Sequence, residues 1–592
     1  MRKIILSITL AAMTALSVWS APALPGLTQV VQADGTTLYI QQQGDEHHNW
    51  LETSDGILLV GRGRSYYVAD IADDGSLSPS SLLAHESALR SQAEQAAVAR
   101  QARRLYLFQN YTLRKAEAHR RAAQVNGTSY LPHEGSPRIL VILTAYKDQG
   151  FTVNDPLQAF DQYLNGKEQK DMGNENQRNV ASVRTYFETC SKGNFSPQFD
   201  VVGPVTLPDS MAYYGYGGGN TSAERLGQMA KDALTLVKDQ VDMRRYDNNG
   251  DGRAELVYLI YSGVGENQNG PAENLWAKVS PQNTNLGDSM RLSYVGCCSE
   301  LFHLQRPGWI NGIGVFCHEF SHAMGLPDIY PTQEAGRKVN NQSMEHWDVM
   351  DNGIYNNNGF APQPYTAWEM EAMGWQAIET LQDDAQHVSM LPIIEEGGKA
   401  YKIPNDKNER EFIVVENIQQ RGLAAGARGH GLLAYHVAYP YNTVNMGDAP
   451  NNTVGKPAVA VIPADSLLMS GYLVSDGVYT SAQLKASLTG DPFPGTSGNT
   501  RLNDDQRLPN FKFYNTSDTR VHSSLLNITE DASTGIVSFD YQHGDVTDGI
   551  MTIDRYAHAG IDRYYNLAGQ RVDSHIAPRK TIRIIKGRKV VL

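Results

Sequence analysis

Residues 317–330 have the sequence CHEFSHAMGLPDIY, and this stretch decides how the centre of the chain folds. If the residues before Gly325 form one helix, His318 and His322 project from the same face, one turn from each other. Two imidazoles at this spacing can bind one Zn²⁺. The pattern therefore predicts a metal-binding helix; the alternative is a capped core helix that carries surface histidines.

The residues after this helix can complete a catalytic zinc site. Gly325 can adopt the left-handed conformation that ends a helix, and Pro327 prevents the helix from continuing. Asp328 then lies in a turned segment and can return its carboxylate to the metal. A catalytic zinc takes three protein ligands and keeps a further position for water. Glu319, beside the first histidine, is placed to act as a general base on that water without being a ligand.

Helix and strand patterns alternate around this stretch. Continuous apolar runs at 138–146 and 255–265 are typical of buried strands, and helical patterns lie between them. We therefore expect an α/β domain over residues 131–378. Short strands and turns follow, which predict a β-sandwich over residues 379–545.

The N-terminal part falls into three sections. Residues 1–20 have a basic start, an apolar run and small residues at the end, which predict a signal peptide; the alternative is an N-terminal anchor. Residues 24–83 alternate apolar runs with turns, as in a small antiparallel sheet. Residues 84–125 contain no Pro or Gly and predict one or two long helices. The fold class we expect is multidomain α+β, with a catalytic α/β domain flanked by an α+β region over 21–130 and the β-sandwich.

Composition and charge exclude several classes of partner. At 592 residues the chain is too long for one core. Its net charge of −13 argues against nucleic acid, and no segment after the N-terminal run is apolar for long enough to cross a membrane. We expect a protein that is secreted or held at the cell surface. The chain has four cysteines: Cys190, Cys297, Cys298 and Cys317. They could form one disulfide, or all four could be buried thiols.

Several motifs resemble one protein family. HEFSHAMGLPD resembles the elongated zinc motif of metzincin-type metalloproteases, in the variant with Asp as the third ligand. Together with WDVMDNG and YTAWEMEAMGW, it is similar to the bacterial immune inhibitor A-like metalloprotease family. The stretches FDVVGPVTLP, DNNGDG, FIVVENI, GLLAYHV and DPFPGTSGN are similar to the same family, and they extend the resemblance into the β-rich region.

This resemblance implies a metzincin-like catalytic domain with a methionine turn at Met350, a hydrophobic floor beneath the zinc. Some metzincins place a Tyr two residues after that Met, but Asn352 stands here, and nearby Tyr355 is the candidate oxyanion donor. The N-terminal region resembles the propeptide of the family and implies a zymogen. No cysteine precedes Cys190, so inhibition by a cysteine–zinc switch is excluded.

The segment YDNNGDGRAE at 246–255 is similar to the start of a calcium loop, with oxygen ligands at alternate positions. Its twelfth position is Tyr258, which cannot supply a bidentate carboxylate. An ordinary Asx-turn before a strand is the alternative to Ca²⁺ binding. The candidate calcium ligands are Asp247, Asn249, Asp251 and Glu255.

Residues 546–592 are strand-rich and basic. Their YNLAGQRV and IIKGRKVVL are similar to tails that direct export by the type IX route in some Gram-negative bacteria. This similarity implies a secretion signal that contacts the export machinery. A plain edge hairpin that closes the β-domain is the alternative.

Together these features predict a secreted zinc endopeptidase made as a zymogen. It would hydrolyse peptide bonds in protein or peptide substrates with one catalytic zinc and Glu319 as general base. Within the enzymes, the alternative is a zinc hydrolase of cell-wall peptides. The rival from another class is a non-catalytic binding or adhesion protein on a zincin scaffold. Glu319 argues against that rival, because a purely structural metal site needs no base.

Overall fold

The computed structural model describes residues 21–45, 48–63, 65–121, 129–167, 178–215, 224–287, 290–303, 308–333, 341–381, 385–475, 478–514 and 517–544. Beyond them it describes only strands β20 (Tyr564–Tyr565), β21 (Arg571–Val572), β22 (Ile582–Ile585) and β23 (Arg588–Val591), which form two hairpin-like pairs. The chain divides into two units, residues 1–543 and 544–592. The expected signal peptide and most of the expected C-terminal secretion signal lie outside the described residues.

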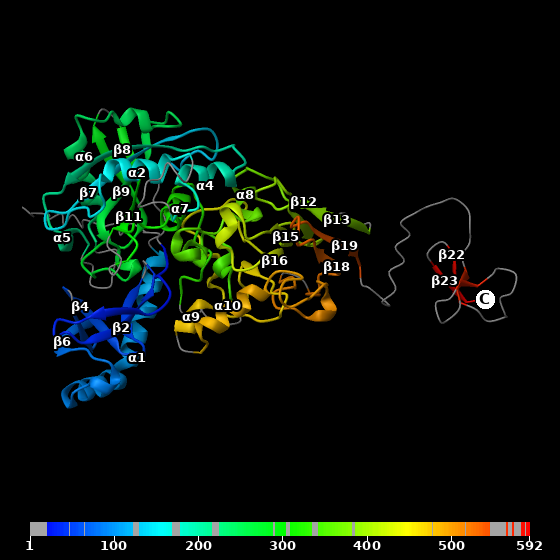
Figure 1. Ribbon diagram of the computed structural model, residues 1–592, viewed down its shortest axis with the longest axis horizontal. Coiled ribbons are helices and arrows are strands. Elements are labelled where there is room, and N and C mark those ends of the chain that lie inside the picture. The colour runs from blue at the N-terminus through cyan, green and yellow to red at the C-terminus, as the bar shows by residue number, and fades with distance from the viewer. Residues whose placement is uncertain are drawn as a thin grey trace, which may run out of the picture. The chain divides into compact units, whose positions relative to one another are not determined.

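The N-terminal region is an antiparallel sheet of six strands that is packed against one long helix, drawn in blue in Figure 1. Strand order follows the sequence, so each strand pairs with the next. Ala97 and Phe108 of the helix pack into the two apolar clusters of the sheet. Sheet and helix lie where the sequence predicts them. The elements are β1 (Thr28–Val31), β2 (Thr37–Gly44), β3 (Asn49–Thr53), β4 (Leu58–Arg62), β5 (Ser65–Ile71), β6 (Leu77–Leu83) and α1 (Gln92–Arg121).

The central domain is built on a five-stranded sheet of order β10-β11-β9-β7-β8. Neighbouring strands run parallel except at one edge, where β10 is antiparallel to β11. Strand β7 explains the apolar run at 138–146, because Val141 and Leu143 enter one core cluster while Leu140 and Ile142 enter the cluster on the other face. The strands are β7 (Arg138–Ala145), β8 (Gln198–Thr206), β9 (Arg253–Val264), β10 (Lys278–Gly287) and β11 (Met290–Leu301).

Helices cover both faces of this sheet, as expected for an α/β domain. Two helices, α5 (Met211–Gly215) and α6 (Leu226–Val237), share a core cluster on one face. The other face is covered by α2 (Pro156–Asn165), α4 (Val183–Cys190) and α7 (Ile313–Ala323), whereas α8 (Ala367–Ala372) packs on β15 (Phe412–Ile418) of the C-terminal part. Helix α7 carries the HEFSH sequence and is buried along its whole length.

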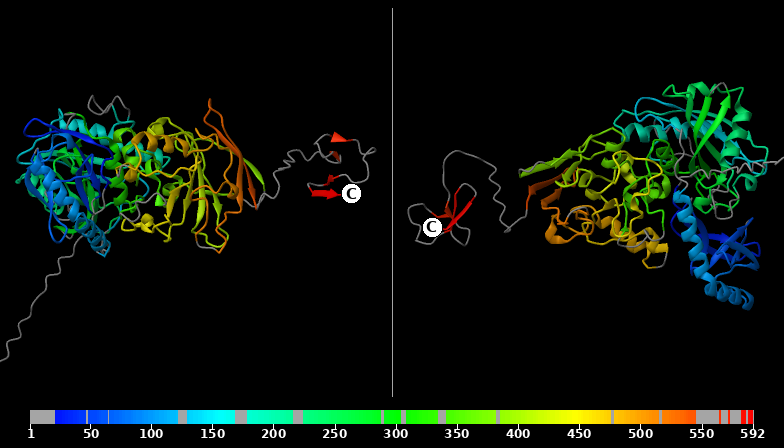
Figure 2. Two further views of the ribbon diagram at one scale, coloured as in Figure 1. Left: turned by 90° about the horizontal axis from the view of Figure 1, so that it is seen from below. Right: turned by 180° about the vertical axis from the view of Figure 1, so that it is seen from behind.

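The C-terminal part of the first unit contains two sheets that share one hydrophobic core, coloured from yellow-green to orange-red in Figure 2. The first sheet contains β12 (Glu379–Thr380), β14 (Tyr401–Pro404), β15 (Phe412–Ile418), β16 (Gly431–Val437) and β17 (Val459–Val461), in that order. The second has the order β13 (Gln386–Met390), β19 (Val537–His543), β18 (Ser523–Glu530). Two short helices, α9 (Gly471–Ser475) and α10 (Ser481–Gly490), lie between β17 and β18 in the sequence.

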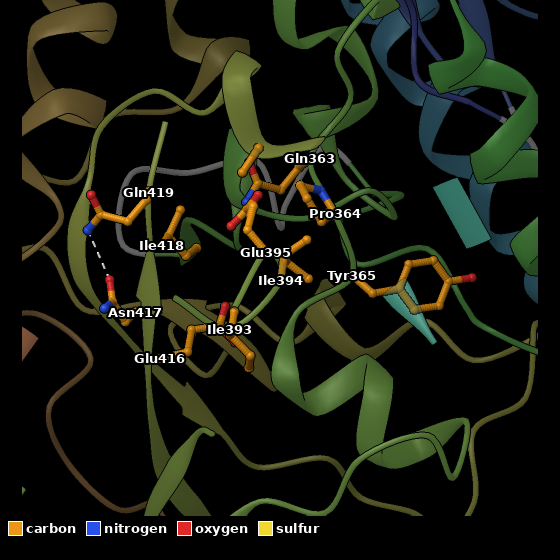
Figure 3. Close-up of a pocket in the computed structure, with 11 residues that line it drawn as sticks. Gln363, Pro364, Tyr365, Ile393, Ile394, Glu395, Glu416, Asn417, Ile418 and Gln419 are labelled. Atoms are coloured by element: carbon orange, nitrogen blue, oxygen red, sulfur yellow. Dashed lines mark hydrogen bonds between the residues drawn. The ribbon is translucent and has the colours of Figure 1, made fainter. Parts of the chain in front are cut away.

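A small hollow marks the junction between the central domain and these sheets (Figure 3). Glu416 of β15 crosses the junction, since its Oε2 accepts the amide of Ala367 at the start of α8 at 2.7 Å. Burial raises the pKa of Glu416 to about 8. Asn417 and Gln419, also in Figure 3, bond to each other at 2.9 Å. Glu416 therefore joins the two domains, whereas Asn417 and Gln419 bond within the C-terminal part.

All four cysteines are buried and unbridged, so buried thiols are the arrangement that the fold adopts. Among the described residues, no helix combines the length and apolar character needed to cross a membrane.

Candidate metal centre

Helix α7 ends where Gly325 predicts. The helix stops at Ala323, and Gly325 follows with φ +102°, a conformation that glycine adopts without strain. The Gly325 amide donates to the carbonyl of His322 at 2.9 Å, and the Leu326 amide donates to that of Ser321 at 3.2 Å. These bonds close the helix end and reverse the chain. The turn returns Asp328 to the face that carries both histidines.

Three ligand atoms converge beside this helix end. Nε2 of His318 and Nε2 of His322 are 3.2 Å apart, and each lies 3.3 Å from Oδ1 of Asp328. A tetrahedral zinc with ligands at 2.0–2.1 Å holds them about 3.3–3.4 Å from each other. The three residues are buried, and they form a group capable of holding a metal. The spacing of the donor atoms therefore fits zinc.

The electrostatics of the group fit a cation as well. Burial alone would raise the pKa of Asp328, but His322 and His318 outweigh burial and hold the pKa at about 2, so the residue is a carboxylate. Its buried Oδ1 faces the two imidazole Nε2 atoms at 3.3 Å. A buried carboxylate is costly unless a cation neutralises it. The charge and burial of the Asp328 carboxylate are therefore those expected of a metal ligand.

The segment Asp348–Met350 lies against the ligands and fixes their orientation. Nδ1 of His318 lies 2.8 Å from the carbonyl of Val349, and Nδ1 of His322 lies 2.7 Å from that of Leu326. A proton on Nδ1 leaves Nε2 free to bind a metal. The amide of Ile329 donates to the carbonyl of Met350 at 2.8 Å, which ties the loop of the third ligand to the same turn. Met350 itself is fully buried.

Buried carboxyl groups support this turn. Oδ1 of Asp348 accepts the amide of Met350 at 2.6 Å, and Oε2 of Glu369 accepts the amide of Thr366 at 2.7 Å. Burial raises the pKa of Asp348 to about 6, and it raises that of Glu369 well above its ordinary value. Each carboxyl group also influences the pKa of the other, as expected for two neighbouring buried acids.

An N-terminal segment, residues 21–24, lies in the same site. The amide nitrogen of Ala21 donates to Oε1 of Glu319 at 2.7 Å. Nε1 of Trp276 donates to the carbonyl of Ala21 at 2.8 Å, and the Tyr355 hydroxyl donates to that of Pro22 at 2.6 Å. Both Ala21 and Pro22 are buried there.

Sequence motifs pointed to Tyr355 but not to Trp276 or Asn267. The carbonyl of Asn267 accepts the amide of Leu24 at 2.8 Å. Trp276 and Asn267 lie in the loop between β9 and β10 and belong to no ligand-spacing pattern. Only the folded chain brings them to the segment. Tyr355 has its hydroxyl on the segment, and burial raises its pKa, so the group stays protonated and able to donate.

The acidic loop before β9 forms a second group of ligand atoms. Carboxylate oxygens of Asp247, Asp251 and Glu255 lie within 4.8 Å of one another. Glu255 is fully buried, and its Oε1 has no hydrogen-bond donor among the described residues. Burial raises the pKa of Glu255. This oxygen needs a proton or a cation.

The other predicted ligands of this loop are largely engaged in its own turn. Asp247 accepts the amides of Gly250, Asp251 and Gly252 at 2.8–3.0 Å. The Asn249 side chain accepts the Asp251 amide at 2.9 Å and donates to its carboxylate at 3.3 Å. These are Asx-turn contacts. Both the turn and a grouped set of carboxylates are therefore present.

Residues 138–376 match the family described as immune inhibitor A peptidase M6, catalytic domain, which is the family that the motifs resemble. This match supports a metallopeptidase.

Two curated relatives share the region. Pre-pro-metalloprotease PrtV of Vibrio cholerae serotype O1 (strain M66-2) is 27% identical over 229 residues, which cover 33% of this chain and 23% of PrtV. Immune inhibitor A of Bacillus thuringiensis subsp. alesti is 24% identical over 254 residues, 37% of this chain and 36% of that protein. The chain thus spans well under two thirds of the length of these relatives.

Proposed function

We propose that the protein is an exported zinc-dependent endopeptidase made as a zymogen. The observation that carries this proposal is the convergence of Nε2 of His318, Nε2 of His322 and Oδ1 of Asp328 at 3.2–3.3 Å, with Glu319 on the same helix. The proposal includes a metzincin-like catalytic domain with Met350 as its methionine turn. The proposed regions are a signal peptide (1–20), a propeptide (21–130), the catalytic domain (131–378), a β-sandwich (379–545) and a C-terminal secretion signal (546–592).

A zinc ion held by the three ligands would polarise the scissile carbonyl and acidify a water molecule. Glu319 accepts the proton of the attacking water and delivers it to the leaving amine nitrogen. The contact between Ala21 and Glu319 supports this role. The nitrogen of Ala21, which becomes the terminal amine once a signal peptide over 1–20 is removed, lies 2.7 Å from Oε1, within the distance that proton delivery requires.

The zymogen proposal rests on the segment at residues 21–24, which occupies the place a substrate backbone needs. The N-terminal sheet anchors the segment, because the amide of Ala23 donates to the carbonyl of Gly44 at 3.1 Å. The sheet also contacts the catalytic domain, where the Gly63 amide donates to Glu273 at 2.8 Å. Substrate and segment exclude each other, so processing must remove the segment before cleavage begins.

We also propose a Ca²⁺ site at Asp247, Asn249, Asp251 and Glu255, supported by the buried free oxygen of Glu255. Calcium takes six to eight oxygen ligands, so backbone carbonyls or water would complete the shell. Protein and peptide substrates, and the export machinery as a partner of the C-terminal tail, belong to the same proposal.

Metal removal tests the proposed function. After processing, the protein should cleave casein, and 1,10-phenanthroline should abolish cleavage. Addition of Zn²⁺ after removal of the chelator should restore it. Casein cleavage that persists in the fully metal-free protein would overturn the assignment.

A further inference from the structure

The segment at residues 21–24 shows how a peptide backbone runs past Glu319. Because the amide of Ala21 lies on Glu319, this nitrogen marks the position of the leaving nitrogen in a substrate. Ala21 and Pro22 then occupy the places of the first two residues of the leaving product. Both are held through their carbonyl groups, which every peptide offers whatever its side chains.

Trp276 is held firmly in position to bind the first carbonyl. It is fully buried, and its Nε1 lies 2.8 Å from the carbonyl oxygen of Ala21. Its own amide donates to Oε1 of Glu224 at 3.3 Å, and Glu224 forms a buried ion pair with Lys278. The indole N–H can only donate a hydrogen bond, and a carbonyl oxygen can only act as an acceptor, so the two groups are complementary.

Tyr355 binds the second carbonyl, and Asn267 joins the two contacts. The Tyr355 hydroxyl lies 2.6 Å from the carbonyl oxygen of Pro22, and Nδ2 of Asn267 donates to the same hydroxyl at 3.5 Å. Oδ1 of Asn267 accepts the amide of Ala277, the residue after Trp276, at 3.4 Å. The carbonyl of Asn267 also accepts the amide of Leu24.

We propose that Trp276 and Tyr355 bind the carbonyl groups of the first and second substrate residues after the scissile bond, with Asn267 positioning both donors. Tyr355 is thus a substrate-binding residue that lies one residue beyond the reacting bond, and it does not stabilise the oxyanion. The enzyme therefore favours substrates with at least two residues on the leaving side and disfavours release of a single C-terminal residue. This inference rests on the proposed peptidase function.

Two peptide amides that differ by one residue test the proposal with the processed protein. They share the same residues before the scissile bond, and one ends in Ala-NH₂ after it while the other ends in Ala-Ala-NH₂. Only the longer peptide offers the second carbonyl in the place that Pro22 occupies. A hydrogen bond of ordinary strength predicts that the longer peptide has a kcat/KM about tenfold higher in the wild type.

Two variants distinguish the contribution of the Tyr355 hydroxyl from that of the Trp276 indole. Tyr355→Phe should reduce the gain from the second residue to about twofold or less, mainly through KM. Trp276→Phe should lower kcat/KM for both peptides by a similar factor, about tenfold, because both contain the first carbonyl. Tyr186→Phe is the matched control, since it removes a buried hydroxyl that donates to the Gln363 carbonyl at 2.7 Å and touches none of residues 21–24. It should keep the full gain.

The outcomes distinguish this inference from the proposed function. A wild type that cleaves both peptides equally well, or a Tyr355→Phe variant that keeps the tenfold gain, would overturn the assignment of the two donors. A wild type that binds zinc yet cleaves neither peptide nor casein would overturn the peptidase itself. Equal zinc content and equal melting temperature in Tyr355→Phe and Tyr186→Phe confirm that folding does not cause the difference.

Discussion

The two groups of candidate metal ligands differ in how completely the folded chain has arranged and buried their ligand atoms. At His318, His322 and Asp328, the ligand atoms are buried and 3.2–3.3 Å apart. At the second group, Asp247 is half-buried, Asp251 is exposed and Glu255 is buried, and Asp247 already accepts three amides of its own turn. The first set is an assembled site, whereas the second must rearrange to bind.

The origin of the difference is the element that carries each group. A helix and its capping turn place the proposed zinc ligands, and Nδ1 of each histidine lies beside a backbone carbonyl. The acidic loop instead uses its own amides to satisfy Asp247. A cation there competes with existing hydrogen bonds and must offset their loss. We therefore expect large effects from changes at the first group and modest effects at the second.

The largest expected effect is that of Asp328→Ala. Loss of one of three ligands should remove bound zinc and lower casein cleavage by at least about 10³-fold. Elemental analysis and a casein assay measure the two quantities. Asp406→Ala, which removes an exposed carboxylate in the C-terminal region, is the control and should keep both. Full activity in Asp328→Ala would show that another residue completes the site.

Removal of the blocking segment should have the next largest effect. Unprocessed protein that lacks residues 21–25 should hydrolyse a short peptide on the order of 10²-fold faster than the unprocessed full chain. Four hydrogen bonds, at about 0.5–1.5 kcal/mol each, join residues 21–24 to the catalytic domain. A substrate must displace these bonds in the full chain but not in the shortened protein. Equal rates for the two proteins would contradict a blocking role for this segment.

Calcium should stabilise the protein by a smaller amount. Millimolar Ca²⁺ should raise the melting temperature by about 2–4 °C, because binding to the folded state alone adds about 1 kcal/mol or more of stability. Asp251→Ala should abolish this rise, and Mg²⁺ should not reproduce it. A melting temperature of the wild type that does not depend on Ca²⁺ would contradict calcium binding, and the loop would then be an ordinary Asx-turn.

The smallest effect concerns the pH dependence of the N-terminal sheet. Burial lowers the pKa of His85, but its hydrogen bonds to Asp34 and Glu94 outweigh burial and raise the pKa above its ordinary value of 6.5. The charged form therefore stabilises the fold. Its contribution should be complete below about pH 6.5 and should disappear as pH rises through the raised pKa.

Melting temperatures of His85→Gln and wild type across this range measure the contribution. The difference in melting temperature between wild type and His85→Gln should decrease with increasing pH. A difference that is constant with pH would mean that the charge of His85 does not matter.

Local patterns in the sequence predicted the helix and the turn that carry the candidate ligands. Four-residue spacing placed His318 and His322 on one face of α7, and Gly325 ended the helix where a turn was needed. The apolar run at 138–146 predicted β7 because both of its faces are buried. These features depend on residues close together in the chain.

Contacts between distant segments could not be predicted in the same way. Ala21 and Glu319 are 298 positions apart, and Tyr355 and Pro22 are 333 apart. Neither Trp276 nor Asn267 belongs to a motif, and only the folded loop between β9 and β10 brings them to the site. The calcium pattern correctly grouped Asp247 and Asp251, but periodicity could not reveal that Asn249 bonds to Asp251.

The most direct test of the central claim compares wild type and Glu319→Ala after processing, with zinc content and casein cleavage measured on the same samples. We predict about one zinc per chain in both proteins and cleavage by the wild type alone, lower in the variant by at least about 10³-fold. Zinc in both proteins with cleavage by neither would favour a non-catalytic binding protein. Folded wild type without zinc, or a fully active Glu319→Ala variant, would contradict the account.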